Sequence, residues 1–203
     1  MIFMTLKVGI TGGIGSGKSL VCSVFETFGI PVYNADLNAK RLMTADPELK
    51  GSIVKEFGEG CYQDDGSLDR EYLASIVFHD NEKLKILNSL VHPAVQKDVQ
   101  QWFTMQDTPY AIEEAALIFE SGAYKLLDRV ITVTAPKKLR LKRVHNRDNV
   151  PYKEITRRMD NQWPEREKSR LSDFVIRNNG KISLISQIWN IHQELIRLNK
   201  EKK

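Results

Sequence analysis

The sequence has no long hydrophobic run: nothing in its 203 residues approaches the roughly 18 consecutive apolar residues that a membrane-spanning helix needs. Residues 1–5 lack the basic region and the cleavable apolar region of a secretory signal peptide. Cysteine is scarce too: Cys22 and Cys61 are too few for a disulfide framework or a metal-binding set. We therefore expect a cytoplasmic protein with no membrane partner, in which Cys22 is a small core residue.

The composition is neither unusually polar nor unusually repetitive. The chain is 41% hydrophobic and 28% charged, which excludes disordered and fibrous classes and suits one α/β domain with room for a small insertion or lid. The net charge of +4 is unevenly placed. Residues 137–170, the basic segment, hold 12 Lys or Arg and 5 Asp or Glu, a net +7, so the rest of the chain carries −3. The basic segment predicts a local anionic partner, either a polyphosphate or a nucleic acid.

A glycine-rich motif stands near the start of the chain: residues 12–19 read Gly-Gly-Ile-Gly-Ser-Gly-Lys-Ser and match G-x-x-x-x-G-K-[ST]. Glycines without Cβ let backbone N–H groups approach a polyphosphate, and the following helix adds its N-terminal dipole. Lys18 supplies a positive charge for the β- and γ-phosphates, and the Ser19 hydroxyl can ligate Mg²⁺, so the motif predicts a nucleoside triphosphate site. The candidate ATP-binding residues here are Gly13, Ile14, Gly15, Ser16, Gly17, Lys18, Ser19 and Leu20.

Asp36 is the first candidate outside the motif. A strand over residues 6–11, a helix over 19–28 and a short strand over 31–34 precede it. Parallel strands joined by a helix bring their carboxyl ends to one edge of the sheet, where ligands bind. We therefore expect Asp36 beside the motif in a functional role. The alternative is that it caps a helix starting at Leu37.

Residues 37–108 are mostly helical and polar-faced, and this stretch is too long for a simple crossover connection. We interpret it as an inserted acceptor-binding subdomain. Helices are predicted over 47–57, 70–77 and 82–105, and Pro93 predicts a kink or break in the last. His92 beside it is either a structural hydrogen-bonding group or a functional one, and the spacing leaves both open.

Three acidic residues follow the next strand, which is predicted over 110–112: Glu113, Glu114 and Glu120. Acids at this edge of the sheet can hold Mg²⁺ through water or orient an acceptor. They can equally be solvated loop carboxylates. The sequence leaves the two interpretations open.

A helix beginning near Pro136 puts Arg140, Arg143 and Arg147 on one face. Guanidinium groups bind phosphate bidentately and can neutralise charge that develops during phosphoryl transfer, although a run of charges is more often a solvated face. A second helical segment follows over 153–162. We interpret the two arms as a lid that closes over the nucleotide and excludes water.

Two more strands, over residues 129–134 and 174–176, and a final helix over 182–198 complete the pattern. The predicted fold is α/β, a phosphate-loop fold of the nucleoside-monophosphate-kinase type with a five-stranded parallel sheet. We expect one domain, comprising a nucleotide-binding core (residues 1–36, 109–139 and 171–203), the acceptor-binding subdomain (37–108) and the lid (140–170).

The motif alone does not name a reaction, because switches, motors and kinases share it. The guanine-reading Asn-Lys-x-Asp pattern is absent, and no apolar strand ends in the Asp-Glu pair of an oligomeric ATPase. A compact small-molecule kinase remains, in which catalysis is positioning and charge stabilisation. A nucleoside monophosphate kinase or an ATP-dependent nucleic-acid-binding regulator stays open as an alternative.

Motifs in the same order along almost the whole chain resemble the dephospho-CoA kinase family. They are residues 11–19, Ala35-Asp36, Phe57-Gly58, residues 65–70 (Asp-Gly-Ser-Leu-Asp-Arg), Val77-Phe78, His92-Pro93, residues 117–120 (Leu-Ile-Phe-Glu) and residues 175–180 (Val-Ile-Arg-Asn-Asn-Gly). The resemblance implies an ATP-dependent phosphotransferase that acts on the ribose 3′-hydroxyl of dephospho-CoA, the last step of coenzyme A synthesis. We expect ATP with Mg²⁺ and dephospho-CoA as partners, no nucleic acid, and a monomer.

The resemblance also implies roles for single residues. Asp36 is the expected base, and Lys18, Arg143 and Arg147 are the other expected catalytic groups. Thr11, Asp36, His92 and Glu120 are expected to bind the acceptor, Arg143 and Asn178 to bind ATP, and Ser19 to bind the metal. Three residues depart from the family's usual pattern: Leu20 replaces Thr, Ala116 replaces Pro and Arg177 replaces Asp.

Overall fold

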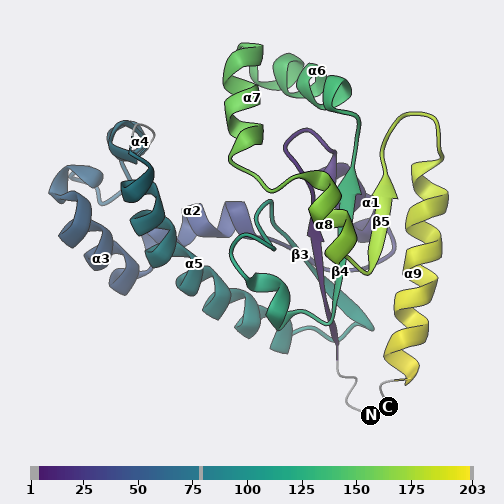
Figure 1. Cartoon of the computed structure of the whole chain (residues 1–203). Helices are drawn as coiled ribbons and strands as arrows, with labels where there is room; N and C mark the ends of the chain where they lie inside the picture. The colour runs from purple at the N-terminus through teal and green to yellow at the C-terminus, as the bar shows by residue number, and fades with distance from the viewer. Residues whose placement is uncertain (1–4, 78–79, 202–203) are drawn as a thin grey trace. The chain divides into compact units, whose positions relative to one another are not determined.

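Five parallel strands form one sheet in the order β2-β3-β1-β4-β5. The computed structural model describes residues 5–77 and 80–201 (Figure 1). The strands are β1 (Leu6–Thr11), β2 (Val32–Asn34), β3 (Tyr110–Glu114), β4 (Arg129–Thr134) and β5 (Phe174–Arg177). The predicted α/β fold with a five-stranded parallel sheet is confirmed. Phe78, from the motifs that resemble the family, lies outside the described residues.

Helices connect the strands. They are α1 (Lys18–Thr27), α2 (Ala35–Ala45), α3 (Pro47–Phe57), α4 (Arg70–Val77), α5 (Asn81–Thr104), α6 (Lys137–Asp148), α7 (Tyr152–Asp160), α8 (Glu165–Leu171) and α9 (Leu184–Glu201), with 3₁₀ turns η1 (Glu59–Cys61) and η2 (Ala123–Leu126). Within residues 5–77 and 80–201, none of the helices combines the length and the apolarity that a bilayer crossing requires.

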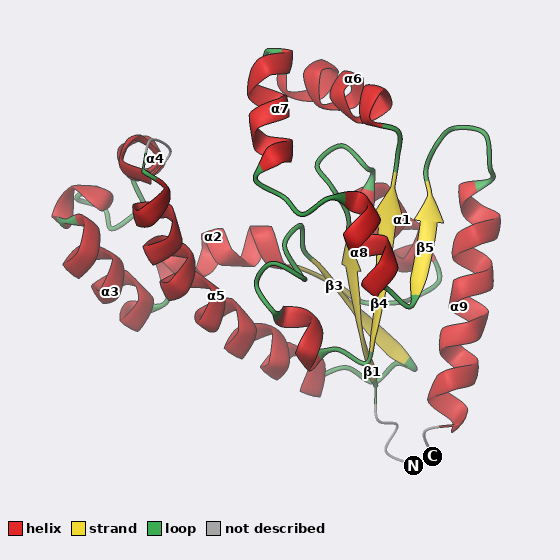
Figure 2. Cartoon of the chain, viewed as in Figure 1, coloured by secondary structure: helices red, strands yellow, loops and turns green. Residues whose placement is uncertain are grey.

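The main core lies between the sheet and two helices, α1 and α9, and Figure 2 shows α9 running beside β5. Alternate residues of β1 belong to it: Leu6, Val8 and Ile10 are at most 4% exposed. Each such side chain contributes roughly 1.5–3 kcal/mol on burial, so this alternation decides which face of β1 meets the helices. Cys22 on α1 is part of the same core, as predicted, and burial raises the pKa of its thiol.

The chain divides into two compact units. The sheet unit, up to Asn34 and from Trp102 onward, contains the whole sheet, the glycine-rich loop and α6 to α9. The helical unit, residues 35–101, contains α2, α3, α4 and most of α5. Inside the helical unit Cys61 is buried, and an ion pair of 2.7 Å joins Arg41 of α2 to Asp98 of α5.

α5 runs through Pro93 without ending, so of the two expectations, a kink or a break, the break is wrong. A proline inside a helix costs about 3 kcal/mol, because it lacks an N–H donor and its ring crowds the preceding turn. Val91, Val95 and Val99 recur every four residues on one face of this helix and are at most 7% exposed. Burying three such side chains outweighs the cost of the proline.

β3 continues two residues further than predicted, through Glu113 and Glu114. Strands on both sides hold these residues, because Glu113 pairs with Gly9 of β1 and with Tyr33 of β2. Glu113 and Glu114 are therefore only 1% and 7% exposed, and for these two the interpretation as solvated loop carboxylates is wrong. Burial raises the pKa of Glu113 to about 7.

Glu113→Gln is expected to raise the free energy of unfolding above pH 7. The native state holds the Glu113 proton up to about pH 7, whereas the unfolded carboxyl loses it near its ordinary pKa of 4.5. The native state therefore binds more protons between these two values, and its stability falls as the pH rises through this window. The difference in pKa corresponds to roughly 3 kcal/mol.

Urea unfolding at several pH values, without nucleotide or metal, measures this effect. The variant should show a flatter pH dependence than the wild type between about pH 4.5 and 7. Parallel curves for the two proteins would contradict a buried, protonated Glu113.

Candidate functional site

The loop between β1 and α1 carries the glycine-rich motif, and none of its glycines leaves room for a Cβ, as Gly17 and Gly13 illustrate. Gly17 is the N-cap of α1 with a φ of 94°, and a Cβ there would lie 2.3 Å from Nδ2 of Asn178. A Cβ on Gly13 would lie 1.8 Å from Nη1 of Arg140. A side chain at Gly17 would push Asn178 away and strain the backbone, and one at Gly13 would push Arg140 away.

Lys18 and Ser19 begin α1 at the end of this loop. The Lys18 ammonium donates to the Gly12 carbonyl oxygen at 3.2 Å, which places it beside the first residue of the motif. The Ser19 hydroxyl donates to Oε1 of Glu114 at 2.9 Å. The other oxygen of this carboxylate, Oε2, accepts from Nδ2 of Asn34 at 3.1 Å. Glu114 of β3 is therefore held by a residue of α1 on one side and a residue of β2 on the other.

The pair formed by Ser19 and Glu114 fits a magnesium ion. A hydroxyl and a carboxylate are hard oxygen ligands, and Mg²⁺ in phosphoryl-transfer sites takes one or two carboxylates together with waters and substrate phosphates. The described part of the chain contains no group of three or more His, Cys, Asp or Glu that could hold a metal by itself. The donor set therefore suits a metal that arrives with a polyphosphate.

Arg143 reaches the loop from α6. Its Nη1 donates to the carbonyl oxygens of Gly15 at 3.4 Å and Ser16 at 3.3 Å. Its Nη2 donates to Oδ1 of Asn178 at 3.1 Å, and Nδ2 of Asn178 donates to the Ser16 carbonyl at 2.8 Å. The structure thus brings together Arg143, Asn178 and the loop, which are far apart in the sequence.

A hollow of about 170 Å³ opens beside the loop. Its lining residues are Gly15, Gly17, Lys18, Ser19, Leu20, Arg143, Val144 and Arg147. All of these except Val144 are candidates named from the sequence. Arg147 also donates hydrogen bonds of 2.6 and 2.8 Å to the carboxylate of the neighbouring Asp148, and these bonds raise the pKa of the guanidinium. That these residues bind ATP remains a prediction.

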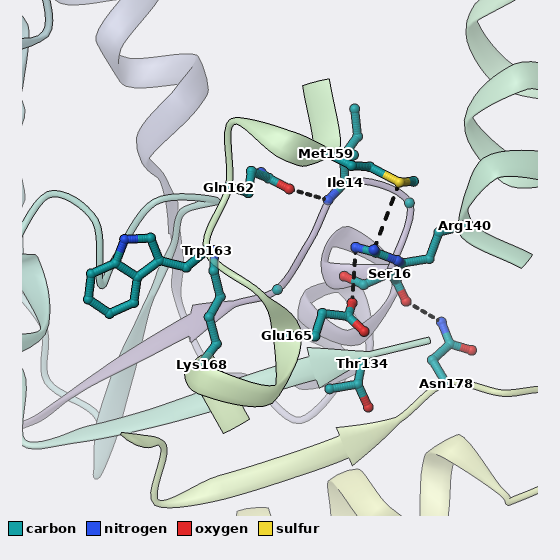
Figure 3. A network of polar contacts seen from close by, with 12 residues as sticks. Ile14, Ser16, Thr134, Arg140, Met159, Gln162, Trp163, Glu165, Lys168 and Asn178 are labelled. Carbon is teal, nitrogen blue, oxygen red and sulfur yellow. Dashed lines mark hydrogen bonds and ion pairs between the residues drawn. The ribbon is translucent and has the colours of Figure 1, made fainter. Parts of the chain in front are cut away.

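Arg140 departs from the expected arginine stripe. It is only 9% exposed, its Nη1 lies 3.1 Å from Oε1 of Glu165, and its Nη2 donates to Sδ of Met159 at 3.8 Å (Figure 3). A buried guanidinium requires an anionic partner, and Glu165 supplies it. The expectation of three arginines on one phosphate-facing stripe is therefore wrong: Arg140 packs against Gly13 and joins α6 to α8.

A second buried cation, Lys168 of α8, holds the loop after β3. Its fully buried Nζ lies 2.7 Å from Oε1 of Glu120 and donates to the Ala116 carbonyl at 2.9 Å. The Trp163 amide donates to the same Glu120 oxygen at 2.9 Å, and the Thr11 hydroxyl donates to the Ala116 carbonyl at 3.2 Å. Sequence reasoning missed Lys168, because nothing distinguishes it there from the other lysines and arginines of the basic segment.

Two candidates lie in the helical unit. α2 begins at Ala35, so Asp36 is in its first turn, and the alternative of a cap for a helix starting at Leu37 is wrong. His92 is half-buried on α5, and burial lowers the pKa of its imidazole, which favours the neutral form at pH 7. The roles of Asp36 and His92, like the acceptor-binding roles of Thr11 and Glu120, stay predictions.

The parallel sheet, with a lysine-bearing glycine loop after its central strand and arginines on the helix after β4, places the chain among the phosphate-loop kinases. The sequence profile of the dephospho-CoA kinase family matches residues 6–183. The chain belongs to the dephospho-CoA kinase family, and it is an ATP-dependent kinase.

Similar proteins match almost the whole chain. The dephospho-CoA kinase of Chlorobaculum tepidum is 39% identical over 202 residues, which cover 95% of this chain and 96% of that protein. The structure of TT1252 from Thermus thermophilus is 32% identical with a TM-score of 0.82 over 94% of this chain and 97% of that one. The dephospho-CoA kinase structure from Campylobacter jejuni is 29% identical with a TM-score of 0.70 over 95% and 98%.

Lys168→Met is expected to lower the free energy of unfolding by about 3–5 kcal/mol, because it leaves the Glu120 carboxylate buried without its cation. Arg158→Met is the matched control. It breaks an exposed pair with Glu154, whose side chain is 50% exposed, and should cost less than about 1 kcal/mol. Urea unfolding of both variants makes the comparison, and equal losses would show that the Lys168 pair is not effectively buried.

Proposed function

We propose that this chain transfers the γ-phosphate of ATP to the ribose 3′-hydroxyl of dephospho-CoA, giving coenzyme A and ADP in the last step of coenzyme A synthesis. The observation that carries the proposal is the family match over residues 6–183, which includes the glycine-rich loop and the helical unit. The loop by itself would fit many kinases, because it recognises phosphates and not the acceptor.

On the donor side, the loop N–H groups and Lys18 hold the β- and γ-phosphates. Arg143 and Arg147, which line the hollow, neutralise charge on the phosphoryl group in flight. Asn178 keeps Arg143 in place and its turn borders the adenine. Ser19 and Glu114 offer the oxygen ligands for Mg²⁺, which reduces the negative charge of the β- and γ-phosphates when it is bound with ATP.

On the acceptor side, Asp36 is the proposed base that accepts the proton of the ribose hydroxyl. It follows Asn34, the last residue of β2, by two positions, and Asn34 contacts the carboxylate of Glu114. Two residues of chain span at most about 7 Å, so connectivity keeps the backbone of Asp36 close to Asn34. The other proposed acceptor-binding residues are Thr11, His92 and Glu120.

We assign residues 37–108 as the acceptor-binding subdomain and residues 140–170 as a lid. The compactness of residues 35–101 supports the first assignment. The second is supported by α6, which carries Arg143 and Arg147, the two arginines beside the loop. A closed lid would exclude water, and this favours transfer to the acceptor over hydrolysis of ATP.

Incubation of the purified full chain with Mg-ATP and dephospho-CoA is expected to yield coenzyme A and ADP in equal amounts, measured by chromatography. Lys18→Ala is the negative control, because it removes the charge that acts on the transferred phosphate. Nucleoside monophosphates serve as competing acceptors. Phosphorylation of a nucleoside monophosphate without any coenzyme A formation would contradict the proposal, as would a salt-sensitive gel shift with nucleic acid in the absence of transfer.

Asp36→Asn is expected to lower kcat by roughly 100- to 10,000-fold with little change in ATP affinity, because an amide does not accept the hydroxyl proton. Asp64→Asn is the matched control, since Asp64 is an exposed aspartate of the same helical unit. The turnover of this variant should stay near that of the wild type. Initial rates at saturating substrates and calorimetric titration with ATP make the measurement. If the turnover of Asp36→Asn stayed within a few-fold of the wild type, Asp36 would not be the base.

A further inference from the structure

Gln162 touches the glycine-rich loop from the connection between α7 and α8. Its Oε1 accepts a hydrogen bond of 2.9 Å from the backbone N–H of Ile14, the third residue of the motif (Figure 3). The two residues are far apart in the chain, and the sequence patterns gave Gln162 no role.

The contact with Ile14 decides how the Gln162 amide is oriented. A backbone N–H only donates, so the atom that meets it must be the amide oxygen, and the Nε2 group is left with two donors. Across residues 5–77 and 80–201, Nε2 of Gln162 makes no hydrogen bond to the protein. The side chain is only half-buried, so part of it is accessible to a ligand.

The position of Lys18 shows which end of a triphosphate this space would meet. The Lys18 ammonium acts on the β- and γ-phosphates in loops of this kind, and here it lies on the carbonyl oxygen of Gly12. Ile14 is two residues further along the same short loop. Gln162 therefore meets the loop two residues from the one that Lys18 contacts, whereas Arg143 and Asn178 meet the loop further along, at Ser16.

Contacts on both sides hold the Gln162 backbone in place. Its N–H donates to the Met159 carbonyl at 3.1 Å, and the amide of the next residue, Trp163, donates to Glu120 at 2.9 Å. The buried ion pairs of Glu165 with Arg140 and of Lys168 with Glu120 then fix α8 beside it. A donor held this firmly loses little freedom when it binds an anion.

We propose that Gln162 is a γ-phosphate ligand: its oxygen is anchored on the Ile14 N–H, and its Nε2 donates to a γ-phosphate oxygen of the bound nucleotide. This inference rests on the proposed function only for the use of ATP as donor, and it is independent of the acceptor. The Gln162 side chain would then contact the loop and the third phosphate at the same time.

The test compares affinities for the β,γ-imido analogue of ATP and for ADP, both with Mg²⁺, by calorimetry on the full chain without acceptor. Gln162→Ala should weaken binding of the analogue by roughly 10- to 100-fold, the range for a hydrogen bond to a charged group, and change ADP binding less than about 3-fold. Gln162→Glu should weaken the analogue at least as much, because its carboxylate can still accept from Ile14 but meets the γ-phosphate with like charge. Asn161→Ala, an exposed neighbour, is the control and should bind both as the wild type does.

Three outcomes would overturn the inference. They are unchanged binding of the analogue by Gln162→Ala, wild-type binding by Gln162→Glu, or equal losses for ADP and analogue, which would assign Gln162 to loop structure alone. Thermal unfolding midpoints within a few degrees of the wild type show that each variant is folded. Wild-type protein that binds the analogue but makes no coenzyme A would refute the proposed acceptor and leave this inference standing.

Discussion

The site depends on the register of β1 between its two parallel neighbours. Ile10 pairs with Glu114 of β3 on one side and with Ile131 of β4 on the other, so the end of β1 is fixed against both strands. A shift by one residue would turn Leu6, Val8 and Ile10 out of the core and move the loop by about 3.3 Å. The 2.9 Å bond between Ser19 and Glu114 would not survive such a shift, so the core on one face of the sheet determines the geometry of the phosphate site.

Several cations of the basic segment are paired with carboxylates, some of them buried and some exposed. Glu165 meets Arg140, Glu154 meets Arg158, and Glu167 meets Arg170, while Lys168 is paired with Glu120 from the loop after β3. Glu120 is the one partner among these four that lies outside the basic segment, so its charge is not counted in the local excess of +7. Arg143 and Arg147 are the charged residues of this segment that line the hollow beside Lys18, which concentrates positive charge where a polyphosphate would lie.

Local patterns predicted most of the fold. The bounds of β1, β4, α3 and α4 agree with the sequence to the residue, because alternation, capping residues and flanking turns all act over a few positions. The errors arose where a distant strand or helix decides the outcome. Glu113 is buried because strands on both sides continue beside it, and Pro93 is tolerated because the valine face of α5 is buried.

The candidate site divides in the same way. The loop, Ser19 and Arg143 could be named from motif and spacing, and Asn178 from the family resemblance; the structure brings them together. Gln162 and Lys168 could not, because what marks them is a partner more than 40 residues away, such as Ile14 or Glu120. Glu114 lies between these cases: its place just after a predicted strand, at the edge of the sheet, was visible, but its contact with the Ser19 hydroxyl was not.

The burial of both cysteines has a chemical consequence for a protein that would handle coenzyme A. The acceptor that we propose ends in a free thiol. Once an oxidant has converted this thiol to a disulfide, an accessible protein thiolate can attack one sulfur, which forms a mixed disulfide and releases the other sulfur as a thiol. Cys22 and Cys61 are buried, and burial raises the pKa of each, so neither presents a thiolate at pH 7. The protein would therefore resist being captured covalently by its own substrate or product.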